Sequence, residues 1–505
     1  MNNIAKKISK LKKDLTYLKQ LFFEQLKETE SSIHIYTHLD ADGLSSGAIL
    51  GKAFYRERIP YQITVLKQLE RKEINKISNL DNGDSKIIIF SDFGSGQYLE
   101  LQERLLNKNK LLNYIIFDHH LPQKISNKNE VELLEEIYKE TSPWHINPYF
   151  YGIDGSIEIS SAGICYYFSL VLNERNVDLS PIAVIGAIGD IQNQGSNKSF
   201  MGVNSLILND AKNANLIEVV IDLNFSPIKS LNEALAFSKD INLPGITGDA
   251  NKALKFLQTL GILMEDSQGK IKTLNDLNQD EKQKISSAII EYSSIKLNIE
   301  IKKIIEKLIV NRYLLKNEKV GSELHDAAEF SNLLNACGRT DSASLGIAIA
   351  MGERKISYEK SQENLIEYKK MLVKSLAWIF EEKKIEEKEN IQFFFGEDVI
   401  PENIIGTIAS MLIFEKSDRI DKSKPIFGLA KREDEGVYKI SGRAHKTIVK
   451  KGVNLSEAIR EACKLSNLDV LGGGHPPAAG TKVPVNKIEI FLENCDKIIQ
   501  KQLEG

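Results

Sequence analysis

The sequence predicts an α/β protein: a doubly wound, mostly parallel-sheet domain with a helical insertion, a long bridging helix and a second α/β domain. Two segments, KIIIFSDF and NYIIFDHH, are apolar almost without interruption up to an acidic end, which is typical of strands buried inside a parallel sheet. Helical patterns separate these segments from the earlier predicted strands, SSIHIYTH and YQITVL. Helical patterns then dominate from about residue 211, and strand patterns return only from about residue 390.

Six segments follow from these patterns. The first residues place Leu11, Leu15, Leu18 and Phe22 at helical spacing among lysines and glutamates, which predicts an amphipathic helix. The stretch beginning YEKSQENL predicts one long helix with a polar side, suited to bridging two domains. The predicted segments are the N-terminal helix (1–30), the first part of the sheet domain (31–210), the helical insertion (211–320), a return segment of the sheet domain (321–356), the bridging helix (357–389) and the second α/β domain (390–505).

Composition narrows the class of protein. The chain has 505 residues, of which 42% are hydrophobic and 27% charged, as in ordinary globular proteins of two or three domains. Its four cysteines lie far apart and form no CxxC, which argues against a disulfide framework and a thiolate zinc site. We find no signal peptide and no membrane-spanning stretch, so we expect a cytoplasmic protein without a membrane partner. A net charge of −3 argues against a uniformly basic surface, although a local basic groove is compatible with it.

Four segments end in residues that can bind a metal ion. Each is a predicted strand or an apolar stretch, and the carboxyl ends of parallel strands lie along one edge of a sheet, where ligands bind. Carboxylates gathered there repel one another and need positive charge, which two divalent cations roughly 3.5–4 Å apart would supply. The segments are THLDADG (His38, Asp40, Asp42), FSDFG (Asp92), FDHH (Asp118, His119, His120) and GAIGD (Asp190).

Structural explanations exist for some of these residues taken singly. Asp92 or Asp190 alone would more often be a turn former or a helix cap, and the acidic turn LDADG could simply cap a helix. FDHH is harder to explain, because three titratable groups at the end of an apolar strand all need partners. The four segments together therefore predict a metal site. Aspartate and histidine without cysteine favour Mn²⁺, with Mg²⁺ and Co²⁺ also compatible.

On these motifs the chain resembles the DHH phosphoesterase superfamily, and more narrowly the archaeal RecJ-like single-strand-specific exonucleases of the GINS-associated type. THLDADG, FSDFG, FDHH and GAIGD match four successive motifs of that superfamily, and GGGHPPAAG resembles the signature of its DHH-associated domain. The resemblance covers residues 31–210 and 325–490 and leaves the insertion unexplained. It identifies the sheet domain as a catalytic DHH domain and the last domain as a substrate-binding one.

The resemblance implies a role for each residue of the metal site. Two ions share Asp92 as a bridging ligand, His120 faces the scissile phosphate, and Asp118 orients the neighbouring imidazoles. His38 departs from bacterial RecJ proteins, which have an aspartate at this position. The implied ligand sets are His38, Asp40 and Asp92 for one ion, and Asp42, Asp92, His119 and Asp190 for the other.

A second group of residues is suited to binding the phosphates of the substrate. The glycines 472–474 allow close backbone approach to an anion, although such a run is more often a plain turn. Ser441 and Arg443 offer a hydroxyl and a planar guanidinium at a predicted strand end. The resemblance implies that Ser441, Arg443 and His475 face the metal site across a cleft, and the backbone of Gly473 and Gly474 beside His475 is a further candidate for binding the anion.

The remaining histidines and one arginine are less clearly assigned. Arg339 in LNACGRTD resembles an arginine that contacts substrate in RecJ, but a tight turn with a structural ion pair explains it equally well. His445 could assist Arg443. We interpret three other histidines as structural: His34, His145 and His325.

Together with the resemblance, the motifs predict a metal-dependent single-stranded DNA exonuclease of RecJ type that acts 5′ to 3′ in DNA replication or repair, with RNA as a second candidate substrate; the sequence itself decides neither DNA against RNA nor the polarity. Few aromatic residues accompany the motifs, so the expected contacts are with the nucleic acid backbone. A phosphodiesterase for short RNA or a cyclic dinucleotide is the alternative within the enzyme class. A replication scaffold that binds the GINS complex and keeps residual activity is the alternative outside it, with the insertion and residues 1–30 as partner surfaces or as plain solvated helices.

Overall fold

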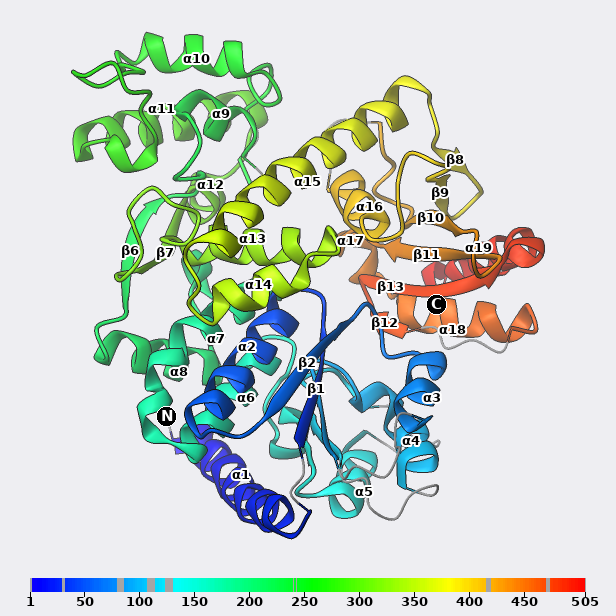
Figure 1. The fold of residues 1–505 in the computed structure, drawn as a ribbon. Coiled ribbons are helices and arrows are strands. Elements are labelled where there is room, and N and C mark those ends of the chain that lie inside the picture. Colours follow the sequence, from blue (N-terminus) through cyan, green and yellow to red (C-terminus); the bar gives the residue numbers. More distant parts are fainter. Residues whose placement is uncertain are drawn as a thin grey trace. The chain divides into compact units, whose positions relative to one another are not determined.

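The computed structural model describes residues 2–29, 32–79, 86–106, 114–122, 130–238, 240–241, 243–414, 419–468 and 473–504. They form two compact units, Met1–Gln362 and Glu363–Gly505, which are described separately (Figure 1). Within these residues no helix combines the length and apolar character needed to cross a membrane.

The first unit is built on a five-stranded parallel sheet, which confirms the predicted fold class. The strand order is β2-β1-β3-β4-β5, so the order reverses between β1 and β3. In open sheets of this kind ligands bind at the carboxyl ends of the strands near such a reversal. The strands are β1 (Ser32–His38), β2 (Tyr61–Leu66), β3 (Lys86–Ser91), β4 (Tyr114–Phe117) and β5 (His145–Ile146).

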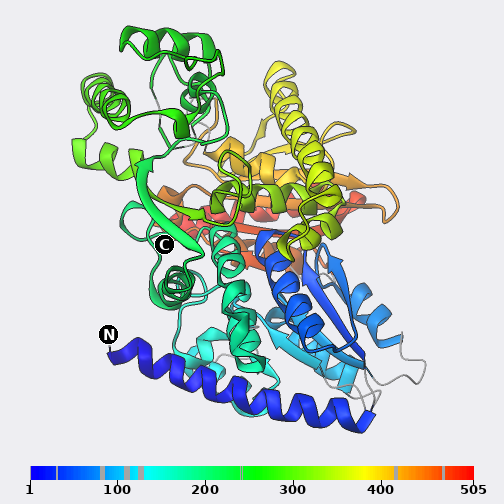
Figure 2. The ribbon, with the colours of Figure 1, turned by 60° about the vertical axis from the view of Figure 1, so that its left-hand side comes forward.

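Helices surround this sheet, and small residues let several of them approach closely. The N-terminal helix α1 is the long dark-blue helix of Figure 2 and buries Leu11, Leu15, Leu18 and Phe22, with Phe22 stacked on Phe54. The helices of this unit outside the insertion are α1 (Asn2–Thr29), α2 (Ala41–Arg56), α3 (Arg71–Asn79), η1 (Ser95–Gln97), α4 (Tyr98–Leu101), η2 (Gln102–Leu106), α5 (Glu130–Thr141), η3 (Pro148–Tyr151), α6 (Ser161–Leu172), η4 (Glu174–Leu179), α7 (Ser180–Gly189), η5 (Ser196–Lys198), α8 (Gly202–Asn213), α13 (Ala327–Arg339) and α14 (Ala343–Ala350).

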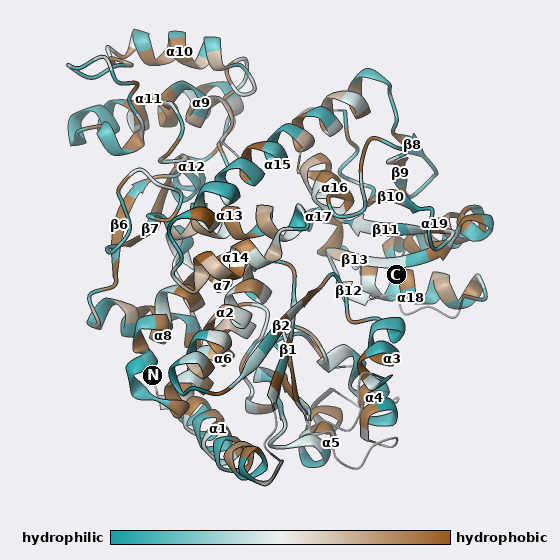
Figure 3. Ribbon diagram, viewed as in Figure 1, coloured by the Kyte–Doolittle hydropathy of each residue, from teal (hydrophilic) through white to brown (hydrophobic). Residues whose placement is uncertain are grey.

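The apolar stretch that ends at Asp190, whose secondary structure the sequence pattern did not decide, is the helix α7 and not a strand. Ser180 and Pro181 begin α7, and proline is well suited to the first turn of a helix. Gly186 faces α2 and α6 so closely that a Cβ atom there would lie 2.6 Å from Ala162 Cβ. Figure 3 shows the hydrophobic character of α7 and α14. Continuous burial, and not strand structure, explains why the segment is apolar.

The insertion differs from the helical prediction because a two-stranded antiparallel sheet lies at its base. β6 (Ile217–Leu223) pairs with β7 (Ile309–Leu315), and both are rich in branched aliphatic residues that favour strands. Between these strands, the residues that the structure describes form four helices and a 3₁₀ turn around a core that includes Leu235, Leu257 and Ile289. They are α9 (Leu231–Ala236), α10 (Ala250–Thr259), η6 (Leu274–Asp276), α11 (Gln279–Leu297) and α12 (Ile301–Leu308).

The second unit has its own six-stranded sheet, in the order β12-β13-β11-β10-β9-β8. Only β9 and β10 are parallel to each other, and the other neighbours are antiparallel. The predicted bridging helix is α15 (Ile356–Glu381), which begins in the first unit and continues into the second. The other elements are β8 (Glu386–Glu387), β9 (Gln392–Phe395), α16 (Ile405–Ile413), β10 (Ile426–Arg432), β11 (Val437–Arg443), α17 (Lys446–Val449), α18 (Leu455–Leu465), β12 (Gly473–His475), β13 (Ala478–Pro484), η7 (Val485–Lys487) and α19 (Ile488–Glu504).

Candidate metal centre

The six predicted metal ligands lie together in the first unit, at the carboxyl edge of its sheet. They come from the ends of different elements: the last residue of β1, the N-terminal cap and first turn of α2, the residues after β3 and β4, and the C-terminal cap of α7. Within each of two groups, one potential ligand atom per residue lies within 4.8 Å of all the others. The groups are His38, Asp40 and Asp92, and Asp42, Asp92, His119 and Asp190.

Asp92 belongs to both groups and presents a different oxygen to each. Its Oδ2 lies 3.3 Å from His38 Nδ1, and its Oδ1 lies 3.4 Å from His119 Nε2. The residue is 2% exposed and has a φ of 65°, in the left-handed region that aspartate tolerates better than most residues. Such an orientation is suited to a carboxylate shared between two ions.

The first group combines one imidazole with two carboxylates. His38 Nδ1 lies 2.8 Å from Asp40 Oδ2. Burial opposes protonation of His38, but the carboxylates of Asp40 and Asp92 raise its pKa well above the usual value. Gly43 is required in this turn, because a Cβ atom there would lie 2.3 Å from the carbonyl oxygen of His38.

The second group is more deeply buried. His119 Nε2 lies 2.9 Å from Asp190 Oδ2 and 3.9 Å from Asp42 Oδ2. Asp42 is fully buried, and its two oxygens accept hydrogen bonds from the backbone N–H groups of Ser161 (2.8 Å) and Ala162 (3.0 Å) at the start of α6. Burial and the neighbouring carboxylates of Asp92 and Asp190 nevertheless raise the pKa of Asp42. A cation between these groups would remove that repulsion.

The unsatisfied atoms of the site fit divalent cations. Within the described residues, five buried atoms at this edge make no hydrogen bond of good geometry: His38 Nδ1, both oxygens of Asp92, His119 Nε2 and Asp190 Oδ2. Buried polar atoms rarely stay unpaired, so these atoms are suited to a partner of another kind. Four carboxylates carry four negative charges, which two divalent cations would balance. Oxygen and imidazole ligands without thiolate are compatible with Mn²⁺ or Mg²⁺.

The residues of FDHH have separate partners. Asp118 Oδ1 accepts a hydrogen bond from the backbone N–H of His120 (3.1 Å) and lies 2.8 Å from His120 Nδ1. Its other oxygen accepts from the N–H of Ser95 at 2.8 Å. Burial acts to raise the pKa of Asp118, but His120, His119 and the Ser95 N–H hold it well below the usual value. Asp118 thus supports His120 directly.

The predicted role of Asp118 is to orient both imidazoles, but the hydrogen-bond partner of His119 Nδ1 is a backbone carbonyl. His119 Nδ1 lies 2.7 Å from the carbonyl oxygen of Gly155, so Nδ1–H donates there and Nε2 faces the carboxylates. Gln192 donates to the same carbonyl at 2.9 Å and accepts from Asn204 at 2.7 Å. A Cβ atom at Gly155 would lie 2.1 Å from the carbonyl oxygen of His119. A hydrogen bond of this kind fixes the tautomer of a metal-binding histidine.

A third group of residues is also close enough together to bind a metal ion. Asp92, His119 and His120 lie within the same 4.8 Å limit, and the side chain of His120 is 40% exposed while His119 is buried. His120 is therefore the imidazole of the motif that solvent or a substrate can reach.

The segment LNACGR packs directly against the first motif. Asn335 Oδ1 accepts a hydrogen bond from the N–H of Ala41 at 3.1 Å. A Cβ atom at Gly338 would lie only 1.7 Å from the carbonyl oxygen of Leu39, so only glycine allows this contact. Arg339 is the half-buried last residue of α13. The segment thus supports the turn that presents Asp40 and Asp42, which gives it a structural role whether or not Arg339 contacts substrate.

The predicted phosphate-binding residues of the second unit also lie together. Ser441 pairs with Gly480, and Gly480 with Gly473, while Arg443 and His475 both pair with Ala478. Side chains two residues apart on a strand, and those directly opposite on neighbouring strands, share one face of a sheet. Ser441, Arg443 and His475 therefore lie on one face.

Two local features shape that face. Arg443 Nε donates to Ser410 Oγ of α16 at 2.8 Å, which holds the guanidinium in place. Gly474 has a φ of 138°, where a Cβ atom would lie 2.3 Å from the carbonyl oxygen of Ala478. Gly472 lies outside the described residues.

The other predicted histidines have structural or local contacts. His34 Nε2 lies 2.8 Å from Thr64 Oγ1, and His325 Nδ1 lies 3.1 Å from the carbonyl oxygen of Leu315. His445 caps α17 through Thr447. His145 differs from these three because it contacts a residue of the metal centre's surroundings. It shares a hydrogen bond with Ser95, whose N–H binds Asp118 of FDHH. No pattern in the sequence indicated this contact.

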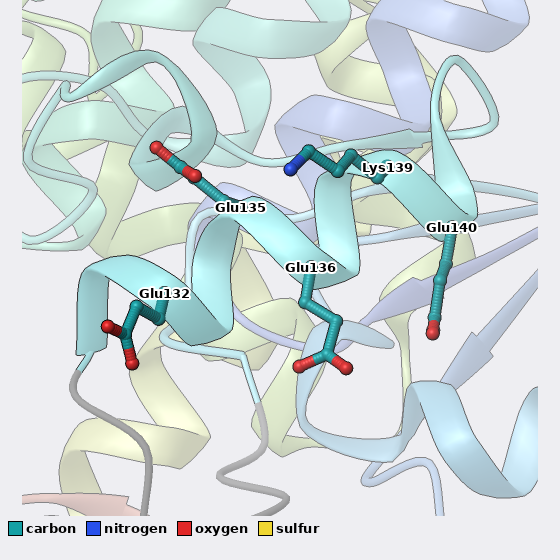
Figure 4. Close-up of a pocket in the computed structure, with 5 residues that line it drawn as sticks. All are labelled: Glu132, Glu135, Glu136, Lys139 and Glu140. Carbon is teal, nitrogen blue, oxygen red and sulfur yellow. The ribbon is translucent and has the colours of Figure 1, made fainter.

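A surface depression on α5 is separate from the metal centre. Figure 4 shows its lining of four glutamates and one lysine on this helix, and none of them is a residue of the metal centre. The lining residues are Glu132, Glu135, Glu136, Lys139 and Glu140.

Comparisons with known proteins agree with this architecture. Two family models match the chain, the DHH-CID domain over residues 227–309 and the DHHA1 domain over residues 389–501. An uncharacterized protein of Methanocaldococcus jannaschii is 30% identical over 494 residues, which cover 97% of this chain and 98% of that protein.

Solved structures share the fold at low sequence identity. CDC45 from Entamoeba histolytica has a TM-score of 0.64 at 15% identity, covering 97% of this chain and 99% of that one. RecJ in complex with Mn²⁺ from Thermus thermophilus has a TM-score of 0.55 at 16% identity, covering 97% of this chain and 55% of that one.

The fold, the gathered aspartates and histidines and the DHHA1 domain define a hydrolase of the phosphoesterase class. Through its DHH-CID and DHHA1 domains the chain belongs to the DHH superfamily, and it shares its fold with RecJ and CDC45.

Proposed function

We propose that the chain is a single-stranded DNA exonuclease, active also on RNA, that releases nucleotides 5′ to 3′ by two-metal hydrolysis in DNA replication or repair. The observation that carries the proposal is the orientation of Asp92, whose two oxygens face His38 and His119 separately. Paired sites that share a carboxylate are typical of enzymes that cleave phosphodiesters.

The ligand groups would hold two ions, for which we propose Mn²⁺. His38, Asp40 and Asp92 would bind one, and Asp42, Asp92, His119 and Asp190 the other. When bound, such ions activate a water molecule and stabilise the negative charge that develops on the phosphoryl group. The RecJ structure with Mn²⁺ supports this choice by analogy, because it shares the fold.

The side chains of FDHH and the residues that bind them would supply the rest of the catalytic site. His120, which is the exposed imidazole of FDHH, would donate a hydrogen bond to the scissile phosphate, and Asp118 holds that ring through Nδ1. The carbonyl of Gly155 fixes the tautomer of His119, so that Nε2 would be the atom that binds an ion. On this proposal His119 would bind an ion and His120 would take part in catalysis, and their separate hydrogen-bond partners support that division.

The second unit would bind the phosphates of the substrate. Ser441, Arg443 and His475 offer a hydroxyl, a guanidinium and an imidazole on one face of its sheet. Guanidinium groups are well suited to phosphate oxygens, and such contacts follow the backbone and not the bases. We therefore expect little sequence preference. Arg339 is a further candidate for substrate contact.

The test uses oligonucleotides of single-stranded DNA and RNA, labelled at either end and incubated with Mn²⁺. A 5′ exonuclease releases the 5′ label at once as a mononucleotide and produces a ladder from the 3′ label. His119→Ala and Asp190→Ala should each lose more activity than the roughly 10–100-fold that an outer hydrogen-bond partner is worth. Asp178→Ala removes an exposed carboxylate of the same unit and should retain activity. Unchanged degradation by both ligand variants would contradict the two-metal site.

Two other functions have specific support. A phosphodiesterase for short RNA or cyclic dinucleotides uses the same centre, and cleavage of dinucleotides without degradation of polymers would favour it. A replication scaffold that binds GINS is supported by the similarity to CDC45 over nearly its whole length. The complete ligand set favours an active enzyme, and a protein that binds GINS but cleaves no substrate would favour the scaffold.

A further inference from the structure

Asn147 is a fully buried side chain that connects two turns of the metal centre. It follows β5, the short strand that pairs with β4, so it lies at the same edge of the sheet as FDHH. Its Nδ2 donates to the carbonyl oxygen of His120 at 2.8 Å and to Ser95 Oγ at 2.9 Å. Its Oδ1 accepts from the N–H of Tyr149 at 3.1 Å and caps η3. Both hydrogens and the oxygen of this amide are therefore used.

Ser95 is the residue through which Asn147 reaches Asp118. Its backbone N–H donates to Asp118 Oδ2 at 2.8 Å, and its hydroxyl also shares a hydrogen bond of 2.7 Å with His145 Nε2. Ser95, His145 and Asn147 are each at most 1% exposed. Ser95 is the first residue of η1 and follows Asp92 by three residues, and the left-handed backbone of Asp92 needs support from its surroundings.

The contacts of His119 involve none of these three residues. His119 is held by Gly155, with Gln192 and Asn204 behind that carbonyl. The two neighbouring histidines therefore have separate sets of buried supporting groups. One set holds His119, which faces the carboxylates. The other set holds Asp118 and the exposed His120.

We propose that Asn147, acting through Ser95 and with His145, is a positioning residue that fixes Asp118 and His120 for the reaction and leaves metal binding to the other set. The inference rests on the proposed function of this site. Loss of the amide removes one hydrogen bond from the carbonyl of His120 and one from the hydroxyl of Ser95, so the two turns lose the side chain that connects them. Partners of this kind typically change activity by about 10–100-fold.

The experiment compares three substitutions in the full-length protein. Asn147→Ser keeps an oxygen for capping η3 but cannot make both donated bonds. Gln192→Leu perturbs the set behind His119. Asn176→Ser is the matched control, because Asn176 is equally buried and bonds Ser169 and Arg56 away from the metal centre. Each variant is measured for kcat, KM and Mn²⁺ affinity, and thermal melting establishes that it folds.

The ring signals of ¹³C-labelled histidine give a readout that does not need activity. The chain has eight histidines, so substitution of each assigns its signal. In the metal-free protein Asn147→Ser should shift the ring signal of His120. It should also lower kcat by about 10–100-fold with KM and Mn²⁺ affinity unchanged. Gln192→Leu should instead weaken Mn²⁺ binding, and Asn176→Ser should change neither.

An unmoved His120 signal in a folded Asn147→Ser protein overturns the inference. Equal losses of kcat and Mn²⁺ affinity in that variant also overturn it, since Asn147 would then support the metal ligands. Should Asn147→Ser not fold, Ser95→Ala removes only the shared hydroxyl, keeps the N–H to Asp118, and must shift the same signal. A wild-type protein that cleaves no phosphodiester contradicts the proposed function, and the His120 signal still decides this inference.

Discussion

Lowering the pH should weaken Mn²⁺ binding, because protons compete with the ions for His38 and His119. Burial opposes protonation of both rings. Even so, Asp40 and Asp92 raise the pKa of His38, and Asp190 and Asp92 raise that of His119, well above 6.5. In the metal-free protein the two imidazolium groups therefore partly balance the carboxylates that the ions would otherwise balance.

The magnitude follows from the ligand sets. Each set contains one histidine, and a metal-binding imidazole must lose its proton, so each ion displaces one proton. Below the folded-state pKa of these rings, the Kd of each ion should rise about tenfold for each pH unit lost, or about 1.4 kcal/mol. The effect begins as the pH falls through that raised pKa, which lies above 6.5, and the affinity is constant at higher pH.

Titration calorimetry in buffers with different ionisation enthalpies counts the released protons directly. His38→Asn keeps an oxygen that can bind a metal but no group that titrates, so this variant should release one proton fewer. Mn²⁺ binding without proton release at pH 6.5 and below, or an affinity that is independent of pH there, would refute the reasoning.

Two further substitutions test the packing. Gly186→Ala should destabilise the protein by about 1–3 kcal/mol and weaken Mn²⁺ binding, because the new Cβ atom would lie 2.5 Å from Asp42 Oδ1, while Gly96→Ala meets no atom within 4 Å and should be neutral in both assays. Arg312→Ala should lower the free energy of unfolding by about 3–5 kcal/mol in urea titrations, because Arg312 is 7% exposed and pairs with two buried carboxylates. Lys303→Ala, in an exposed pair, should cost less than about 1 kcal/mol. If Gly186→Ala and Gly96→Ala lost similar stability, the first prediction would be contradicted. The second would be contradicted if Arg312→Ala and Lys303→Ala did.

The sheet and three motif positions could be predicted because local pattern and position agree. β1 alternates apolar and polar residues, while β3 and β4 are short apolar runs that end next to their polar residues, and all three strands lie within the predicted segments. In a parallel sheet these ends meet at one edge, so the sequence alone brings Asp92 close to His119.

The elements that the sequence analysis missed have ambiguous local patterns. A buried helix such as α7 is apolar on every side and has no period that distinguishes it from a buried strand. β5 has only two residues, one of them a histidine, so no alternation is visible. For the same reason the sequence missed Asn147, which follows β5 at the edge where the strand-end argument would have placed it.

The supporting groups behind the ligands were missed for a different reason. Gly155 and Gln192 lie 36 and 73 residues from His119 in the chain, and their contacts with it exist only in the folded protein. A hydrogen bond to a backbone carbonyl also cannot be recognised from residue type, because every residue has that carbonyl. The identity of residue 155 is nevertheless informative, since only glycine allows its backbone to approach the His119 carbonyl.

Asp92 can be distinguished from the other carboxylates through the histidines it faces. It contributes to the raised pKa of both His38 and His119, whereas Asp40 contributes to the first and Asp190 to the second. In metal-free protein, Asp92→Asn should therefore lower both pKa values, and Asp190→Asn only that of His119. Histidine ring signals followed across pH measure both at once. A shift confined to one ring in Asp92→Asn would show that this carboxylate acts on one histidine only, which would contradict a position between the two sites.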